Sequence, residues 1–246
     1  MSQSSRRSSV VVRLMGEALA IFVGVGAALG GQAWFEARTD RVEEREYLEA
    51  VLAEVEAVQA LADTLNVFLD RQRSLAIQVA GLLAQPPNRI QADSLALLAP
   101  MLSTYATFQV HRRAEDLFAS EALAVVKDAS VRSALADFRG DLLVLGSYLT
   151  QNREFVLSDY RRFGMEYLDL RDRFWRFEPE TPPASRHHRD GARLAESPEF
   201  ENIIDMLIIQ YRNGRSGLDL LRDGMVSARE AAEGRLADLS RGWTNR

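Results

Sequence analysis

Glu17 is the side chain best placed for chemistry in this chain, because it is the one carboxylate inside the apolar stretch 14–35 (LMGEALAIFVGVGAALGGQAWF). A carboxylate in hydrocarbon costs about 3 kcal/mol on insertion scales, so such a group usually packs against a partner or lines a proton or ion path. Arg13 lies four residues earlier, within reach of an ion pair. Two interpretations therefore stay open: a functional or packing role within the membrane, and a pair with Arg13 or the lipid headgroups.

The other residues with catalytic or metal-binding chemistry form no recognisable site. His187 and His188 are adjacent in a proline-rich stretch, and His111 precedes two arginines. Adjacent histidines cannot easily face one metal from a helix, and the sequence has no cysteine, HExxH, Walker loop, GxSxG or paired ExxH motif. We therefore expect no catalytic residue, no metal site and no cofactor, and we predict that the protein is not an enzyme.

The stretch 14–35 has the length that crosses a bilayer core, about 20 helical residues. Residues 18–35 carry no formal charge, and Trp34 and Phe35 close the run as aromatic residues do at a membrane interface. We therefore predict a transmembrane helix over 14–35, preceded by an N-terminal tail over 1–13.

A cleaved signal peptide is the alternative interpretation of this stretch. Its basic region would be 6–13 and its small-residue cleavage site 31–33. The apolar run is longer than a typical signal, it contains Glu17, and helical sequence continues past Trp34 without an extended linker. These features favour an anchor that is retained.

One face of the predicted span carries small residues at heptad-like spacing. Small side chains let helix backbones approach closely in lipid, where packing drives association. Gly26 and Gly30 add a GxxxG motif on a neighbouring face. The sequence therefore predicts a homo-oligomer or a membrane-protein partner, with helix packing through Glu17, Ala20, Gly24, Ala27, Gly31 and Trp34.

Arginines flank the predicted span on both sides and bear on its orientation. They are Arg6, Arg7 and Arg13 before it and Arg38, Arg41 and Arg45 after it. A short arginine-bearing tail before an uncleaved first span favours a cytoplasmic N-terminus. We therefore predict a single-pass protein of the bacterial inner membrane whose helical domain is periplasmic, with the lipid bilayer as a partner.

The remainder of the chain, 36–246, is predicted as one helical domain. Leu48, Val51, Val55 and Val58 repeat at spacings of three and four, as on a helix face that packs in a bundle. The expected fold is all-α: the transmembrane helix, then an elongated antiparallel bundle with a short-helix insert that forms a cap or elbow. The expected elements are long helices over 38–84, 130–177 and 198–239, short helices within 93–128, and a proline-containing linker over 178–197.

Charge excludes one class of partner. The formal net charge is −5, and the first 35 residues carry +2, which leaves −7 for the remainder. Phosphate binding needs a concentrated basic face. We therefore expect no nucleic acid partner.

Two stretches resemble a known family. The first comprises Gly16-Glu17, the glycine-containing span, the exit 32–38 (QAWFEAR) and the charged run 41–48 (RVEEREYL). The second runs from Ala106 to Leu135 with interruptions. Both are similar to an uncharacterised family of bacterial single-span membrane proteins, catalogued as a domain of unknown function, although residues 33–36 depart from the asparagines typical of that exit. The resemblance implies a membrane anchor with a helical domain, and it transfers no activity and no active-site residue.

These observations favour a membrane-anchored helical scaffold or adaptor that self-associates or binds a partner in an envelope complex. A small-molecule-sensing module that acts through a partner is an alternative, because helical bundles bind ligands between their helices. A polar pocket interrupting the aromatic core 160–174 would indicate sensing, whereas continuous packing there would favour the scaffold. An accessory subunit of a membrane transporter or channel is a third possibility.

Overall fold

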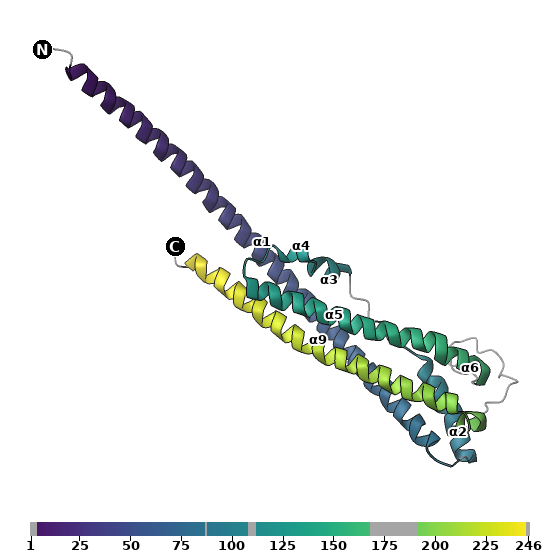
Figure 1. Ribbon diagram of the computed structural model, residues 1–246. Helices are drawn as coiled ribbons and strands as arrows, with labels where there is room; N and C mark the ends of the chain where they lie inside the picture. The colour runs from purple at the N-terminus through teal and green to yellow at the C-terminus, as the bar shows by residue number, and fades with distance from the viewer. Residues whose placement is uncertain (1–3, 87, 108–111, 168–190, 245–246) are drawn as a thin grey trace, which may run out of the picture.

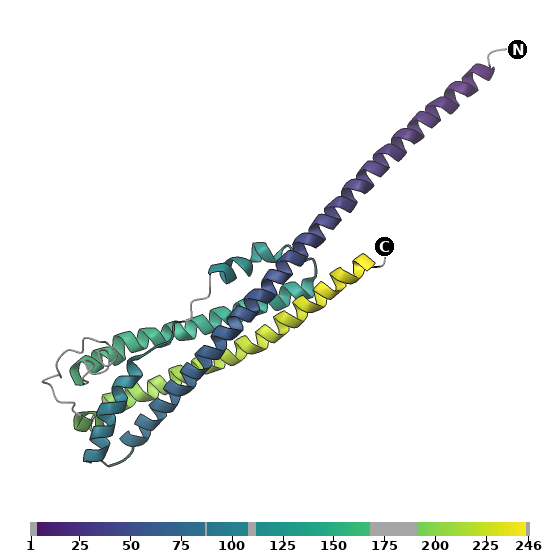
Figure 2. The same ribbon diagram turned by 180° about the vertical axis from the view of Figure 1, so that it is seen from behind.

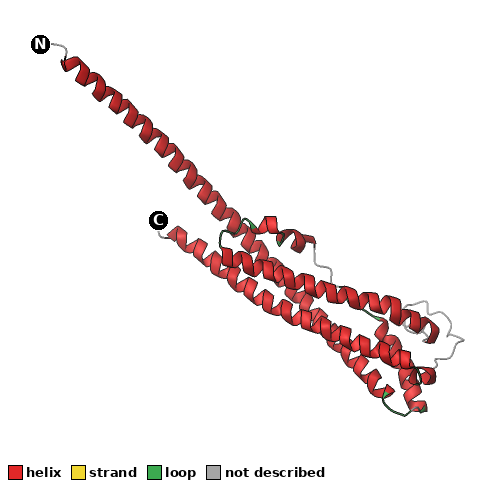
Figure 3. Ribbon diagram, viewed as in Figure 1, coloured by secondary structure: helices red, strands yellow, loops and turns green. Residues whose placement is uncertain are grey.

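The computed structural model describes the backbone of residues 4–86, 88–107, 112–167 and 191–244. Within its helices, the side chains that lie outside the described set are those of 4–24, 26–28, 112, 113, 115 and 242–244. Every regular element in the described ranges is a helix (Figure 3). The predicted all-α class is therefore confirmed.

Three long helices lie side by side over much of their length (Figure 1). They are α1 (Ser4–Leu83), α5 (Ala129–Phe155) and α9 (Pro198–Thr244). The N-terminal part of α1 projects well beyond the other two helices. α5 continues through a π-helical turn, η2 (Val156–Tyr160), into α6 (Arg161–Tyr167). The predicted helix over 130–177 reaches 168–177, which lies outside the described residues.

α1 and α5 run in the same direction, and α9 runs antiparallel to both (Figures 1 and 2). Glu44 of α1 accepts a hydrogen bond from Lys127, just before α5 begins, whereas Leu69 and Leu149 both lie beside Gly214 further along the bundle. The prediction of an antiparallel bundle is therefore wrong for α1 and α5.

The physical reason for this topology lies in the predicted short-helix insert. α2 (Arg89–Leu98) and η1 (Ala99–Ser103) lie where α1 ends, whereas α3 (Arg112–Leu117) and α4 (Ser120–Leu123) lie near the place where α1 leaves the bundle (Figure 1). The chain thus returns along the bundle before α5 begins. The insert spans the bundle and is not the cap or elbow that the sequence predicts.

The core follows the apolar stripes of the long helices. On α1, the predicted face is buried: Leu48, Val51, Val55, Val58, Ala62, Leu65 and Leu69. α9 contributes another buried stripe: Ile204, Leu207, Tyr211, Leu218, Leu221, Met225, Ala228, Ala232 and Leu239. Because α9 contacts both α1 and α5 closely, it is the central helix of the bundle.

Arginines spaced by seven residues along α9 face α1. Arg215 lies 2.6 Å from Asp70, and Arg222 lies 3.0 Å from Asp63. Such partly exposed pairs contribute up to about 1 kcal/mol each, so they add little to stability. The arginines on α9 and the aspartates on α1 both repeat every seven residues. We infer that these ion pairs favour one register of α9 along α1.

Glycines let α9 approach α5. A Cβ at Gly217 would lie 2.8 Å from Cδ2 of Tyr148 and 3.4 Å from Cα of Leu145. A Cβ at Gly224 would meet the carboxylate of Asp141. Glycine has low helix propensity, and the structure places these two glycines at a close helix contact.

One layer of the core is polar. Gln72, Asn152 and Tyr211 each lie one turn beyond the layer in which Leu69, Leu149 and Gly214 meet, and all three are buried. Nε2 of Gln72 donates to the Thr104 hydroxyl at 2.8 Å, while Oε1 of Gln72 and Nδ2 of Asn152 have no hydrogen-bond partner. This polar layer therefore buries one hydrogen-bond acceptor and one hydrogen-bond donor without partners, between apolar layers.

The end of the bundle where α1 ends contains a helix that the sequence does not predict. Asn88 and Gln91 form a capping box at the start of α2. α8 (Gly191–Ala195) packs on α2 so closely that a Cβ at Gly191 would overlap the backbone of Ala92. The predicted linker over 178–197 is therefore corrected at 191–195, and 178–190 lies outside the described residues.

The backbone of the predicted span continues into the bundle without a break, because α1 is one helix from Ser4 to Leu83. In the part of the chain that the structure describes, no helix combines the length and the apolar character needed to cross a membrane. Within the predicted span 14–35, the side chains of 14–24 and 26–28 lie outside the described residues.

We expect Gly217→Leu to destabilise the protein by about 1–3 kcal/mol, because the new side chain would displace Tyr148 and meet the α5 backbone. Gly234→Leu is the matched control on the same helix, because no atom lies within 4 Å of its Cβ position. That control gains helix propensity and is expected to be neutral or slightly stabilising. Urea unfolding followed by circular dichroism measures both, and equal midpoints would contradict the close contact.

Candidate functional site

The residues predicted to pack in the membrane all fall on α1. Glu17, Ala20, Gly24 and Ala27 lie outside the residues whose side chains are described. Gly31 and Trp34 are described and exposed, and a Cβ at Gly31 would have no atom within 4 Å. At Gly31, no other described part of the chain therefore covers the predicted packing face of α1.

Glu44 marks the place where α1 leaves the bundle. Its side chain is 1% exposed, whereas residues 29–43 of α1 are exposed. Arg235 of α9 donates from Nε to Oε1 at 3.0 Å and from Nη2 to Oε2 at 2.9 Å. The backbone N–H of Lys127 donates to Oε1 at 2.9 Å. This bidentate, charge-assisted arrangement joins α1, α9 and the start of α5 at one point.

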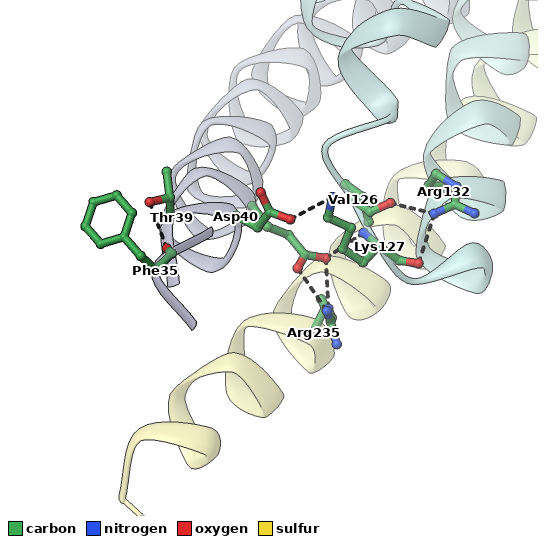
Figure 4. Close-up of polar contacts among 8 residues, drawn as sticks. Phe35, Thr39, Asp40, Val126, Lys127, Arg132 and Arg235 are labelled. Atoms are coloured by element: carbon green, nitrogen blue, oxygen red, sulfur yellow. Dashed lines mark hydrogen bonds and ion pairs between the residues drawn. The ribbon is translucent and has the colours of Figure 1, made fainter. Parts of the chain in front are cut away.

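The turn before α5 is held by further charged groups (Figure 4). Nζ of Lys127 lies 3.2 Å from the Asp40 carboxylate, and Arg132 donates to the carbonyl oxygens of Val126 and Lys127 at 2.6 and 2.9 Å. Figure 4 shows Arg235 reaching the same region from α9. The turn is thereby tied to α1 from one side and to α5 from the other.

Two pKa shifts follow from these contacts. The hydrogen bond to Glu44 raises the pKa of Arg235 further above its usual value. Asp128 caps the start of α5, and the hydrogen bonds from the Ser130 hydroxyl and from the backbone N–H groups of Val131 and Ser130 lower its pKa. Both groups are therefore charged at neutral pH, as these contacts require.

Tyr47 ties α3 to α1 at this junction. Its hydroxyl donates to the carbonyl oxygen of Leu117, the last residue of α3, at 2.7 Å. Burial raises the pKa of Tyr47 to about 12, so the phenol stays neutral and keeps its proton for this bond. The short helix is thus anchored by one neutral hydrogen bond.

A cleft of about 500 Å³ opens between α1 and the end of α9 at this junction. Charged side chains of both signs and two apolar side chains line it: Arg41, Val42, Arg45, Glu46, Glu49, Leu239 and Ser240. Arg45 and Glu49 form an exposed pair at 2.8 Å. The cleft combines an apolar floor with charged walls, which is suited to an amphiphilic ligand.

Helix periodicity alone does not reveal this junction, although the sequence contains a signal for it. Glu44 precedes Leu48 by four residues, so it extends the buried stripe of α1 with a carboxylate. Arg235 stands between Ala232 and Leu239 on the buried face of α9. An acid and an arginine on two core faces suggest a buried pair, but pairing them requires the register of α1 against α9.

The histidines give no support for a metal site. His111, His187 and His188 lie outside the described residues. Among the residues that are described, no group of three or more histidine, aspartate or glutamate side chains is placed to hold a metal ion. In the described part of the aromatic stretch 160–174, Tyr160 and Phe163 are buried, and Phe163 stacks on Tyr167 and Phe200.

Comparison with known proteins finds no matching family model, no matching curated protein and no matching solved structure.

We expect Glu44→Ala to lower the free energy of unfolding by about 3 kcal/mol, because Arg235 would stay partly buried without its counter-charge. Glu43→Ala removes an adjacent, exposed glutamate and is expected to change stability by less than about 0.5 kcal/mol. Thermal unfolding of both variants measures the difference. Equal losses would show that the buried pair contributes nothing beyond a surface charge.

Tyr47→Phe should change the pH dependence of stability in alkaline solution. The pKa of Tyr47 is raised from 10.0 to about 12 in the folded state, so its contribution is complete below pH 10 and is lost as pH rises through 12. Near pH 8 the wild type should exceed the variant by about 1 kcal/mol, from the hydrogen bond to Leu117. Unfolding series from pH 8 to 12 test this, and a gap that does not narrow would contradict the burial of the phenol.

Proposed function

We propose that this protein is a membrane-anchored helical scaffold or adaptor of a bacterial envelope complex. In this proposal, 14–35 of α1 crosses the inner membrane with a cytoplasmic N-terminus, and the bundle stands in the periplasm. The supporting observation is the architecture of α1, which is one helix from Ser4 to Leu83. Its later half forms the core of the bundle, while its N-terminal part, with the apolar stretch, projects beyond the other helices (Figure 1).

Exposed apolar side chains on the projecting part support a membrane or helix partner. Among its described residues, Val25, Leu29, Trp34 and Phe35 are 53–65% exposed. The guanidinium of Arg38 lies 5.6 Å from the centre of the Trp34 ring. Large apolar side chains gathered on a projecting helix are typical of a surface that lipid or another protein covers. An aromatic residue beside an arginine fits the interface at the end of a span.

The proposed mechanism of assembly is helix association in lipid. Gly31 leaves open space on the predicted packing face, which allows a second backbone to approach. Because α1 passes from the span into the bundle without interruption, helices paired in the membrane would hold their bundles at a defined spacing. We propose a homo-oligomer on this basis, with a different membrane protein as the alternative partner.

A second candidate, ligand sensing through a partner, has one observation in its favour. The buried polar layer contains an acceptor on Gln72 and a donor on Asn152 that lack hydrogen-bond partners. The π-helical turn η2 begins four residues after Asn152, and such turns recur at functional sites. Against sensing, the described aromatic residues beyond this layer pack continuously. The scaffold is therefore the function that we favour.

The test is disulfide crosslinking of single-cysteine variants in native membranes, which is feasible because the chain has no cysteine. We expect crosslinked dimers from cysteines at Ala20, Gly24, Ala27 and Gly31, because these positions share one helix face. Phe22 and Leu29 are the matched controls on the opposite face and should crosslink much less. The products are measured by non-reducing gel electrophoresis.

Each outcome bears on the proposal. Crosslinks from the small-residue face to another protein would replace the homo-oligomer with an adaptor. Equal crosslinking at all positions would contradict a specific packing face. Extraction of the protein from membranes by alkaline carbonate would contradict the anchor itself.

A further inference from the structure

Two opposite charges that line the cleft beside Glu44 have no partner among the described residues. Neither Arg41 nor Glu46 makes a hydrogen bond or an ion pair to another residue in the described ranges, although both line the cleft. The two residues are five positions apart on α1, about 140° around the helix, so they stand at opposite edges of one face. An unpaired cation and an unpaired anion therefore flank the same space.

The floor between these charges is apolar. Val42 lies between them on α1 and is 40% exposed, and Leu239 comes from the end of α9 and is 8% exposed. Arg45 and Glu49 also line the cleft and are already paired with each other. A ligand that matches this cleft has an anionic group, a cationic group and an apolar body.

The position of the cleft suggests the source of such a ligand. Arg41 follows Phe35 by six residues, which is about 9 Å along a helix. The polar headgroup layer on each side of a bilayer is about 5–8 Å thick. If the span ends at Trp34 and Phe35, as we propose above, Arg41 at the rim of the cleft borders the headgroup layer.

We propose that this cleft binds the headgroup of an amine-bearing zwitterionic phospholipid, phosphatidylethanolamine. Arg41 donates hydrogen bonds to the phosphate, and Glu46 accepts them from the primary ammonium. Val42 and Leu239, which lie between these two charges, contact the two methylene groups that join the phosphate to the ammonium. The ammonium of ethanolamine has N–H donors that a choline headgroup lacks, and a glycerol headgroup has no cation, so the carboxylate of Glu46 selects the amine. This proposal rests on the anchor proposed above.

The test uses the full-length protein in nanodiscs made from equal parts of phosphatidylethanolamine, phosphatidylcholine and phosphatidylglycerol. Native mass spectrometry after release counts the lipids retained by each chain. We expect phosphatidylethanolamine to be retained preferentially. Arg41→Gln and Glu46→Gln should each lower its retention about tenfold, as expected for the loss of one charge-assisted hydrogen bond. Arg73→Gln and Glu56→Gln are matched controls on exposed positions of α1 and should retain it unchanged.

The outcomes separate this inference from the anchor. A chain that does not co-elute with nanodiscs contradicts the proposed anchor. A chain that co-elutes but retains the three lipids equally, or retains them equally in all variants, overturns the lipid site alone. Preference for phosphatidylglycerol that is lost in Arg41→Gln but kept in Glu46→Gln would also overturn it, because that pattern reports attraction of an anion to arginine.

Discussion

The buried carboxylate of Glu44 sets where the bundle ends. A charge that is 1% exposed must keep its counter-charge and its hydrogen bonds, and Glu44 receives them from Arg235 and from the backbone of Lys127. α9 and the start of α5 are therefore held at one level of α1. Beyond that level, the side chains of α1 from 29 to 43 are exposed.

The topology places the end of α9 at the same end of the bundle as the exit of α1 (Figure 1). α9 is the central helix, because both α1 and α5 pack on it, and the glycines at 217 and 224 let α5 come close. A consequence is that the cleft forms from two chain segments nearly two hundred residues apart. In the proposed orientation this end faces the membrane, so the junction, the cleft and the projecting helix form one continuous surface.

The continuity of α1 links the projecting part of this helix rigidly to the bundle. A helix that runs from the proposed membrane segment into the core of the bundle couples the orientation of the two parts, because no loop intervenes. The ion pairs of Arg215 and Arg222 with α1 favour one register of α9 along the same helix. We infer that association of the projecting helices would position the bundles, which suits a scaffold better than a protein that must open and close.

The sequence by itself determined the helical class and the buried faces, because the spacing of Leu48, Val51 and Val55 is a local property of one helix. It also indicated the start of α9 at Pro198, where a serine and a proline mark a helix N-terminus. It did not reveal α8. Gly191 of that helix lies so close to the backbone of α2 that a side chain would not fit there. The parallel course of α1 and α5, the pair of Glu44 with Arg235 and the cleft were decided by the tertiary structure alone. Each depends on which helices meet and in which register, and helix periodicity contains no information on either.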